Sequence, residues 1–306
     1  MNRSAAAHID IHPRVEEALR RGGPVVALES TIITHGMPYP ANNDMAARVE
    51  AIVAEEGAVP ATIAVMDGRL KVGLSDGERA ALATRLGTMK LSRADLAFAI
   101  AERRTGGTTV AATMIGAHLA GIRVFATGGI GGVHKGAEQS FDISADLDEL
   151  ARTPVIVVSA GAKAILDIPK TLEVLETRGV PVVGYGADVM PAFWSRHSDF
   201  PAPLRLDSAE AIASFQRTRE ELGIAGGMLV ANPVLAGDEI PAAEMRGFIE
   251  AAQKAANENG VTGKAVTPFL LQKILELSDG ASLRTNIALV ENNARLAARI
   301  AIALAA

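Results

Sequence analysis

Short apolar runs alternate along the chain with longer segments in which apolar residues recur about every 3.6 positions. Several of the short runs contain no polar residue, as expected of strands buried on both faces of a sheet. They predict strands at residues 24–28, 62–66, 122–126, 155–159, 180–184 and 228–231. The periodic segments predict helices at residues 43–56, 76–86, 93–103, 109–120, 169–178, 208–222, 242–259, 267–277 and 283–306. Such alternation is typical of an α/β fold.

The segments between these elements indicate a single α/β domain over residues 1–306 with small excursions from the sheet. The dipeptide Asp67-Gly68, between TIAVM and RLKVG, predicts a two-residue hairpin turn. Residues 190–207 contain three prolines and no clear period, so we expect a long loop there. Residues 1–12 are expected to form a flexible N-terminal tail.

Composition narrows the chemistry that the domain can perform. Of the 306 residues, 49% are hydrophobic, which is enough for a large core, and none is cysteine. The missing thiols exclude disulfides, thiolate metal sites and a cysteine nucleophile, so a nucleophile must be an oxygen or a lysine. The six histidines are scattered, and any metal is therefore expected to be held by oxygen ligands.

Charge and hydropathy exclude two classes of partner. The net charge is −5 and no run of Lys and Arg reaches five residues, which disfavours binding to polymeric nucleic acid. No window holds about 18 uninterrupted apolar residues, as a membrane-spanning helix would need. We therefore expect a soluble cytoplasmic protein.

Polar residues that directly follow apolar strands are the first candidates for chemistry, because ligands gather at the carboxyl ends of strands in α/β sheets. Glu29 follows PVVAL, where desolvation favours a protonated carboxyl and a general acid; capping a turn or pairing with an arginine is about as plausible. Lys163 follows VIVVS, where a desolvated amine could act as a nucleophile or Schiff-base former. A buried lysine paired with an acid is the equal alternative.

Two glycine-rich segments could approach a ligand. In TGGTTVAATMIGAH, residues 105–118, free amides and hydroxyls ahead of a helix suit a phosphate, although a simple loop and N-cap explain them equally well. The segment ATGGIGGVHKG, residues 126–136, lacks the spacing of a dinucleotide fingerprint. Its glycines beside Thr127 and His134 still suggest backbone close to a ligand, whereas a single histidine is more often structural.

The segment SFDISADLDEL is rich in carboxylates. Asp142, Asp146, Asp148 and Glu149 could hold Mg²⁺ or Mn²⁺ through one or two oxygens, with water completing the shell. A helix N-cap at Ser144 explains Asp146 and Asp148 more simply, because acids stabilise a helix N-terminus. That interpretation leaves Asp142 unexplained.

Taken together, these segments resemble the pseudouridine-5′-phosphate glycosidase family, also called indigoidine synthase A-like. The resemblance runs from about residue 13 to the C-terminus and rests on long motifs in the same order. They are ALESTIITHGMPYPANNDMA, TIAVMDGRLKVGL, KLSRADL, GGTTVAATM, FATGGIGGVHKGAEQSFDISADL, VSAGAKAILDIPKTLE and LRTNIALVENNARLAARIA.

The resemblance implies reversible cleavage of the C–C glycosidic bond of pseudouridine 5′-phosphate to uracil and ribose 5-phosphate. It implies a three-layer α/β/α sandwich around a mostly parallel or mixed sheet, and a homotrimer. Lys163 would attack ribose C1′, Glu29 would donate the proton and Asp142 would bind Mn²⁺. The further positions that it implies at or near the substrate are Lys90, Thr109, Val110, Thr127, His134, Ser144, Ala145, Asp146 and Asn286.

Two other functions stay open at this point. The same lysine chemistry would serve a Schiff-base lyase or aldolase acting on another phosphosugar. A non-catalytic regulatory module that binds phosphosugars would bind ribose 5-phosphate without turnover.

Overall fold

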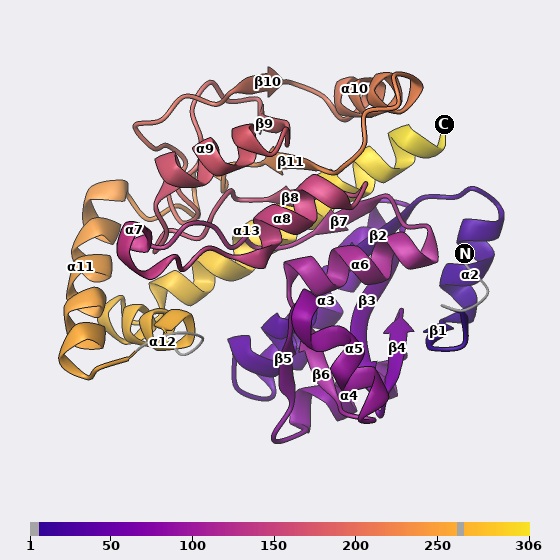
Figure 1. The fold of residues 1–306 in the computed structure, drawn as a ribbon, viewed down its shortest axis with the longest axis horizontal. Coiled ribbons are helices and arrows are strands. Elements are labelled where there is room, and N and C mark those ends of the chain that lie inside the picture. The colour runs from indigo at the N-terminus through magenta and orange to yellow at the C-terminus, as the bar shows by residue number, and fades with distance from the viewer. Residues whose placement is uncertain (1–5, 262–265) are drawn as a thin grey trace.

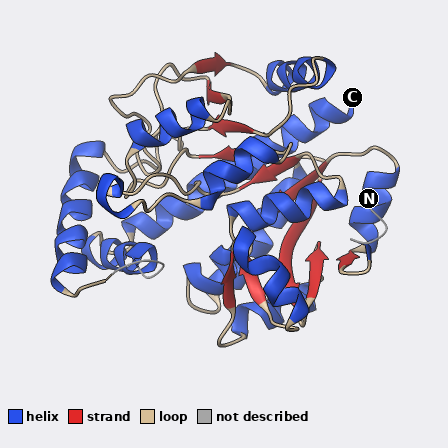
Figure 2. Cartoon of the chain, in the orientation of Figure 1, coloured by secondary structure: helices blue, strands red, loops and turns tan. Residues whose placement is uncertain are grey.

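The computed structural model describes residues 6–261 and 266–306, whose strands form one continuous sheet (Figures 1 and 2). Its strands follow one another across the sheet as β1 (Ile9–Ile11), β4 (Arg69–Val72), β3 (Val59–Met66), β2 (Val25–Leu28), β7 (Val124–Ala126), β8 (Ile156–Ser159), β11 (Met228–Ala231), β9 (Val182–Tyr185) and β10 (Leu204–Leu206). Two further strands, β5 (Met89–Leu91) and β6 (Gly106–Thr108), extend the sheet from β3. Neighbours are parallel except where β3 meets β4 and β6. The sheet is therefore mixed and mostly parallel.

Helices cover both faces of this sheet. On one face, α13 (Ala281–Ala305) crosses β2, β7 and β8 and packs against α3 (Ala41–Glu55) and α10 (Ala209–Glu221). On the other, α6 (Val110–Ala120) packs against β2, β3 and β7, and beside it α8 (Ala145–Arg152) contacts α9 (Ile168–Thr177). Figure 1 shows α6 and α8 in front of the sheet and α13 behind it. The expected three-layer α/β/α sandwich is confirmed.

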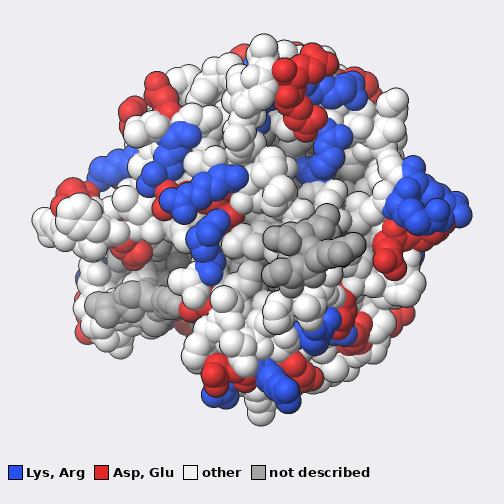
Figure 3. All heavy atoms as spheres, turned by 45° about the vertical axis from the view of Figure 1, so that its right-hand side comes forward, with Lys and Arg blue, Asp and Glu red and all other residues white. Residues whose placement is uncertain are grey.

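The remaining helices lie at the margins of these layers. They are α2 (Pro13–Arg20), α4 (Asp76–Thr84), α5 (Arg93–Ala101), α7 (Ala137–Ser140), α11 (Ala242–Glu258), α12 (Val266–Leu277) and the short π-helix η1 (Ile32–Gly36). In the described part of the chain, no helix is long and apolar enough to cross a membrane. Acidic and basic side chains are interspersed on the face shown in Figure 3.

The central strands are buried because both of their faces are covered. All residues of β2 and β8 are buried. Burying one valine, leucine or isoleucine side chain contributes about 1.5–3 kcal/mol to the stability of the fold. This explains why these strands are readable from the sequence as apolar runs without alternation. Each of the six predicted strands overlaps an observed one.

The predicted hairpin turn is confirmed, since Met66 pairs with Arg69 across it. Asp67 and Gly68 have φ of 49° and 79°, the left-handed pair that a two-residue turn of this kind requires. By contrast, the expected loop before α6 is wrong in part, because residues 106–108 form β6 and pair with β3. The expected tail needs correction too, since residues 9–11 pair with β4; residues 1–5 lie outside the described part.

Candidate active site

Three neighbouring parallel strands, β2, β7 and β8, end at the same edge of the sheet. Glu29 follows the first of them, Thr127 the second, and the loop after the third carries Lys163. Parallel pairing therefore brings together side chains that lie up to 134 positions apart in the sequence. This is the edge at which the sequence predicts chemistry.

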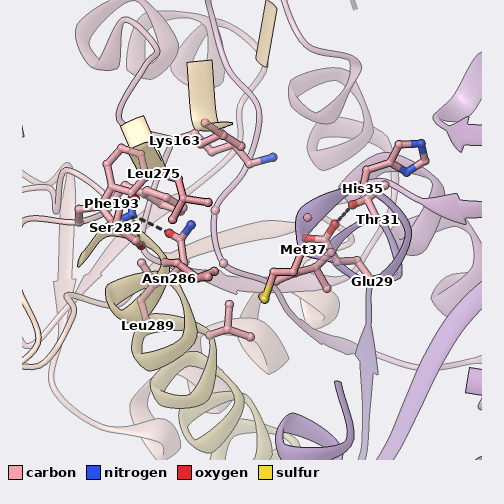
Figure 4. A pocket seen from close by; sticks show the side chains of 18 of the residues that line it. Glu29, Thr31, His35, Met37, Lys163, Phe193, Leu275, Ser282, Asn286 and Leu289 are labelled. Carbon is pink, nitrogen blue, oxygen red and sulfur yellow. Dashed lines mark hydrogen bonds between the residues drawn. The ribbon is translucent and has the colours of Figure 1, made fainter. Parts of the chain in front are cut away.

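A cavity of about 170 Å³ opens at this edge (Figure 4). One water molecule needs roughly 10–15 Å³ by this kind of measure, so the cavity has room for a small organic molecule. Its walls come from the chain after β2, the glycines after β7, the loop after β8, and helices α12 and α13. The lining residues are Glu29, Thr31, Ile32, His35, Gly36, Met37, Lys90, Gly128, Gly129, Lys163, Phe193, Trp194, Leu271, Gln272, Leu275, Ser282, Leu283, Asn286, Leu289 and Val290.

The Glu29 carboxylate is held by two hydroxyls. Thr31 Oγ1 donates a hydrogen bond to Oε2, and Thr127 Oγ1 donates one to Oε1. No described arginine or lysine forms an ion pair with Glu29, which removes the alternative of a structural Glu–Arg pair. The carboxyl group is thus oriented at the cavity wall and stays available to a ligand.

The chain after Glu29 turns sharply into the π-helix η1, and β6 packs directly beneath it. Ser30 is fully buried; its hydroxyl donates to the Ile63 carbonyl at 2.6 Å and accepts from the Thr108 N–H at 2.9 Å. A Cβ at Gly107 would lie 2.8 Å from the Ser30 carbonyl oxygen, so only glycine allows this close approach. The segment GGTT, residues 106–109, therefore packs against the turn that follows Glu29 and supports it.

His35, at the end of η1, lines the cavity beside Lys90. Partial desolvation lowers the pKa of His35 below its usual value, and the positive charge of Lys90 lowers it further, whereas a hydrogen bond with the Thr88 backbone acts in the opposite direction. Its Nδ1 lies 2.7 Å from Thr34 Oγ1. A neutral imidazole is favoured at this wall near pH 7.

Lys163 extends its amine into the cavity toward the side on which Glu29 lies (Figure 4). Its backbone N–H donates to the Ile130 carbonyl at 3.1 Å, which fixes the loop after β8 against the glycine-rich loop after β7. No described carboxylate forms an ion pair with the Lys163 amine, so the alternative of a buried lysine paired with an acid does not hold.

Of the other residues that the sequence singles out, Lys90 and Asn286 line the same cavity, and Thr127 lies behind Glu29. Thr109 caps α6 and its buried hydroxyl has no partner among the described residues, while Val110 opens that helix and is buried. The His134 backbone N–H donates to the Asp142 carbonyl at 3.0 Å. The structure thus brings Glu29, Lys90, Lys163 and Asn286 into one cavity and leaves Thr109, Val110 and His134 off its lining.

The carboxylates of SFDISADLDEL do not converge. Ser144 caps α8, whose first residue is Ala145, by accepting the Asp146 N–H at 3.2 Å, so the N-cap interpretation is confirmed. Asp146 accepts two backbone N–H groups, Asp148 pairs with Arg178, and buried Glu149 pairs with Arg93. Among the described residues, no group of three His, Cys, Asp or Glu side chains could hold a metal ion. A metal here would have one protein carboxylate, that of Asp142.

Sequence reasoning missed much of the apolar wall. Phe193 and Trp194 come from the loop predicted at residues 190–207, whose last residues form β10, and their rings meet edge to face with centroids 5.0 Å apart. The signal that the sequence offers is the clustering of aromatics in this proline-rich loop. No sequence pattern pointed to η1 or to His35.

The chain matches a known protein family over most of its length. The family profile described as indigoidine synthase A like protein matches residues 14–303. The chain is 74% identical to pseudouridine-5′-phosphate glycosidase of Mesorhizobium japonicum over 301 residues, covering 98% of this chain and 99% of that protein. It is 64% identical to the protein of the same name from Dinoroseobacter shibae, covering 97% of each.

Two solved structures share the fold. The prealnumycin C-glycosynthase AlnA, in complex with ribulose 5-phosphate, is 37% identical with a TM-score of 0.90 and 97% coverage of both chains. An indigoidine synthase A-like protein from Thermotoga maritima is 34% identical with a TM-score of 0.88 and the same coverage.

Proposed function

We propose that this chain, which belongs to the indigoidine synthase A like protein family, is a pseudouridine-5′-phosphate glycosidase. It cleaves the C–C glycosidic bond of pseudouridine 5′-phosphate reversibly to uracil and ribose 5-phosphate. The observation that carries the proposal is that Lys163 and Glu29 line one cavity at the carboxyl ends of β8 and β2, the two strands that flank β7.

The bond to be broken explains why a lysine is needed. A nucleobase attached through carbon has no heteroatom leaving group, so the usual pair of glycosidase carboxylates is poorly suited to it. An amine that bonds to C1′ stabilises the positive charge that develops there, because its lone pair forms an imine as the base departs with the bonding electrons. Lys163 is the amine that the structure offers beside Glu29.

The reaction proceeds through a covalent adduct between Lys163 and the sugar. Lys163 Nζ bonds to C1′, the C1′–O4′ bond breaks, and O4′ takes a proton. C5 of the base is then protonated and the C1′–C5 bond breaks; its electron pair stays with the uracil ring, and the nitrogen lone pair completes an imine at C1′. Water hydrolyses the imine, which releases ribose 5-phosphate and restores the amine.

Glu29 is suited to the proton step because its orientation is fixed. Hydrogen bonds from Thr31 and Thr127 hold the carboxyl group at the cavity wall, and general acid catalysis needs such positioning before it needs a particular acidity. Lys90 supplies positive charge at the same cavity, and the N-terminus of α6 lies close by in the fold. We assign the phosphate to this side of the site.

We also propose that the activity requires Mn²⁺, with Asp142 as its protein ligand. One carboxylate, Asp142, fits a hard divalent cation that keeps most of its water ligands. Bound there, the cation would supply positive charge for oxygens of the phosphosugar. The homotrimer and the cytoplasmic location are likewise proposals that rest on the family resemblance and, for the location, on the absence of cysteine.

The test is release of uracil from pseudouridine 5′-phosphate, followed by ultraviolet absorbance with and without Mn²⁺. Formation of uracil and ribose 5-phosphate supports the proposal. Turnover of other phosphosugars alone would favour the lyase or aldolase, and ribose 5-phosphate binding that survives Lys163→Ala without turnover by the parent would favour a binding module.

A further inference from the structure

Trp194 makes a side-chain contact with a polar residue of the cavity. The indole is buried, with 1% of its surface exposed, and its Nε1–H donates to Asn286 Oδ1 at 2.7 Å and to the Ser282 carbonyl at 3.1 Å. The first of these bonds is the dashed line that ends at Asn286 in Figure 4. It joins two residues 92 positions apart, one on the loop after β9 and one on α13.

This contact fixes which end of the amide faces the ligand. The indole nitrogen can only donate, so it must meet the amide oxygen, and a flipped amide would set two donors against each other. The Asn286 NH₂ group is thereby directed away from the indole into the cavity (Figure 4). Within the described residues, nothing accepts a hydrogen bond from it.

The surroundings of Asn286 suit a flat heterocycle. Leu275, Leu289 and Phe193 line the same side of the cavity, so the amide is a polar group set in an apolar wall. The Ser282 hydroxyl on that wall is already bonded to Ser278 at 3.0 Å. Apolar walls with a few placed polar groups are the usual way that pockets orient a planar ligand.

We propose that Trp194 is a positioning residue that sets the Asn286 amide to donate to a ring oxygen of the pyrimidine, so that the site selects a carbonyl over an amino group. The inference rests on the proposed function and deepens it. An amide held in this orientation pairs with uracil, whereas cytosine or isocytosine presents an amino group in place of one of the two carbonyls.

The experiment measures the reaction in the direction of synthesis, with ribose 5-phosphate and varied uracil, for wild type and Trp194→Phe. We expect the KM for uracil to rise about fivefold, the order of one neutral hydrogen bond, while the KM for ribose 5-phosphate stays the same. As inhibitors, cytosine or isocytosine should lose less affinity than uracil, because the freed amide can turn to accept.

The matched control is Ser195→Ala, which removes the 2.7 Å hydrogen bond from the next residue of the same loop to the Ile240 carbonyl. It should leave the KM for uracil and the ranking of inhibitors unchanged. A double-mutant cycle tests whether Trp194 acts through Asn286. If it does, Trp194→Phe should have little further effect on the KM for uracil in an Asn286→Ala background.

Asn286→Asp provides a second test that leaves the indole in place. If Trp194→Phe does not fold, this variant still shows whether the Asn286 amide must donate a hydrogen bond to the pyrimidine. The carboxylate still accepts from Trp194 but has no proton to donate, so the KM for uracil should rise at least as much. An equal loss for all three pyrimidines in Trp194→Phe, an effect on ribose 5-phosphate instead, or an unchanged KM in Asn286→Asp would each overturn the inference. Wild type that forms no C–C bond would overturn the proposed function, and this inference with it.

Discussion

The carboxylate of Asp146 accepts the backbone N–H of Ala111 at 2.9 Å and thereby joins the first turn of α8 to the first turn of α6. Its second oxygen accepts the Gly131 N–H at 2.8 Å, and the residue is 6% exposed. One buried side chain thus ties a helix N-terminus to the glycine-rich loop after β7. This position, which the resemblance places at the substrate, has its carboxylate occupied by the protein frame.

Asp146→Ala should therefore destabilise the fold. The substitution leaves the buried Ala111 N–H and the partly buried Gly131 N–H without acceptors. A buried unsatisfied N–H costs about 1–3 kcal/mol and a partly buried one costs less, so we expect a loss of about 2–4 kcal/mol in the free energy of unfolding. Urea unfolding followed by circular dichroism measures it. Asp148→Ala, which breaks an exposed pair with Arg178, should cost less than about 1 kcal/mol. Equal losses for the two variants would contradict the frame role.

Lys163 should form a covalent adduct with the sugar. Borohydride reduction in the presence of ribose 5-phosphate is expected to add a stable mass to the peptide that contains Lys163, because reduction converts the imine to a secondary amine. Lys163→Ala should give no adduct there and lose at least about a thousandfold in kcat. Lys170→Ala, which removes an exposed lysine paired with Glu138, should label and turn over as wild type does. Labelling elsewhere with none at Lys163 would remove the imine from the mechanism.

Thr127→Val should slow turnover while keeping the fold. Valine preserves the shape of the buried side chain but removes the hydroxyl that donates to Glu29, so the carboxyl group loses one of its two anchors. We expect kcat to fall about tenfold, a fraction of what a positioned acid contributes. Thr218→Val makes the same chemical change on the exposed face of α10 and should leave kcat unchanged. An unchanged kcat in Thr127→Val would show that Thr31 alone orients the acid.

Asp142→Ala should abolish the dependence of activity on Mn²⁺ without unfolding the protein. Asp142 lies before α8 and its carboxylate takes no part in the cap, which belongs to Ser144. Chelator-treated wild type should recover activity as Mn²⁺ is added back, whereas the variant should not, and calorimetric titration should show lost Mn²⁺ binding. A variant that is fully active in chelator would show that Asp142 has no metal role.

The sequence predicts the frame of the site better than its walls. Glu29 and Lys163 follow strands of four buried residues, which are readable as apolar runs, and parallel strands necessarily end at one edge. The strand β6 has the sequence Gly-Gly-Thr and contains no apolar run, so the sequence predicts a loop where the support beneath Glu29 lies. The contact between Trp194 and Asn286 depends on how a long loop folds back over α13, and no local pattern encodes that.

Asp10 gives a pH-dependent contribution to stability at the opposite margin of the sheet. It pairs with Arg69 at 2.5 Å and Lys71 at 3.0 Å, so it fastens β1 to β4. The hydrogen bond from Arg69, aided by Lys71, lowers the pKa of Asp10 from 3.8 to about 2. Because the pair is more than one-third exposed, solvent screening reduces its contribution to about 1 kcal/mol.

The direction in which stability changes with pH follows from proton binding at Asp10. Between pH 3.8 and about 2 the unfolded chain binds more protons at Asp10 than the folded one, so stability rises with pH across this window and is complete above it. Asp10→Asn should therefore be about 1 kcal/mol less stable than wild type at pH 7, and the difference should shrink as the pH falls below about 4. Urea midpoints measured at pH 7, 5, 4 and 3 test this. A difference that stays constant across that range would mean that Asp10 holds β1 by a contact that does not depend on its charge.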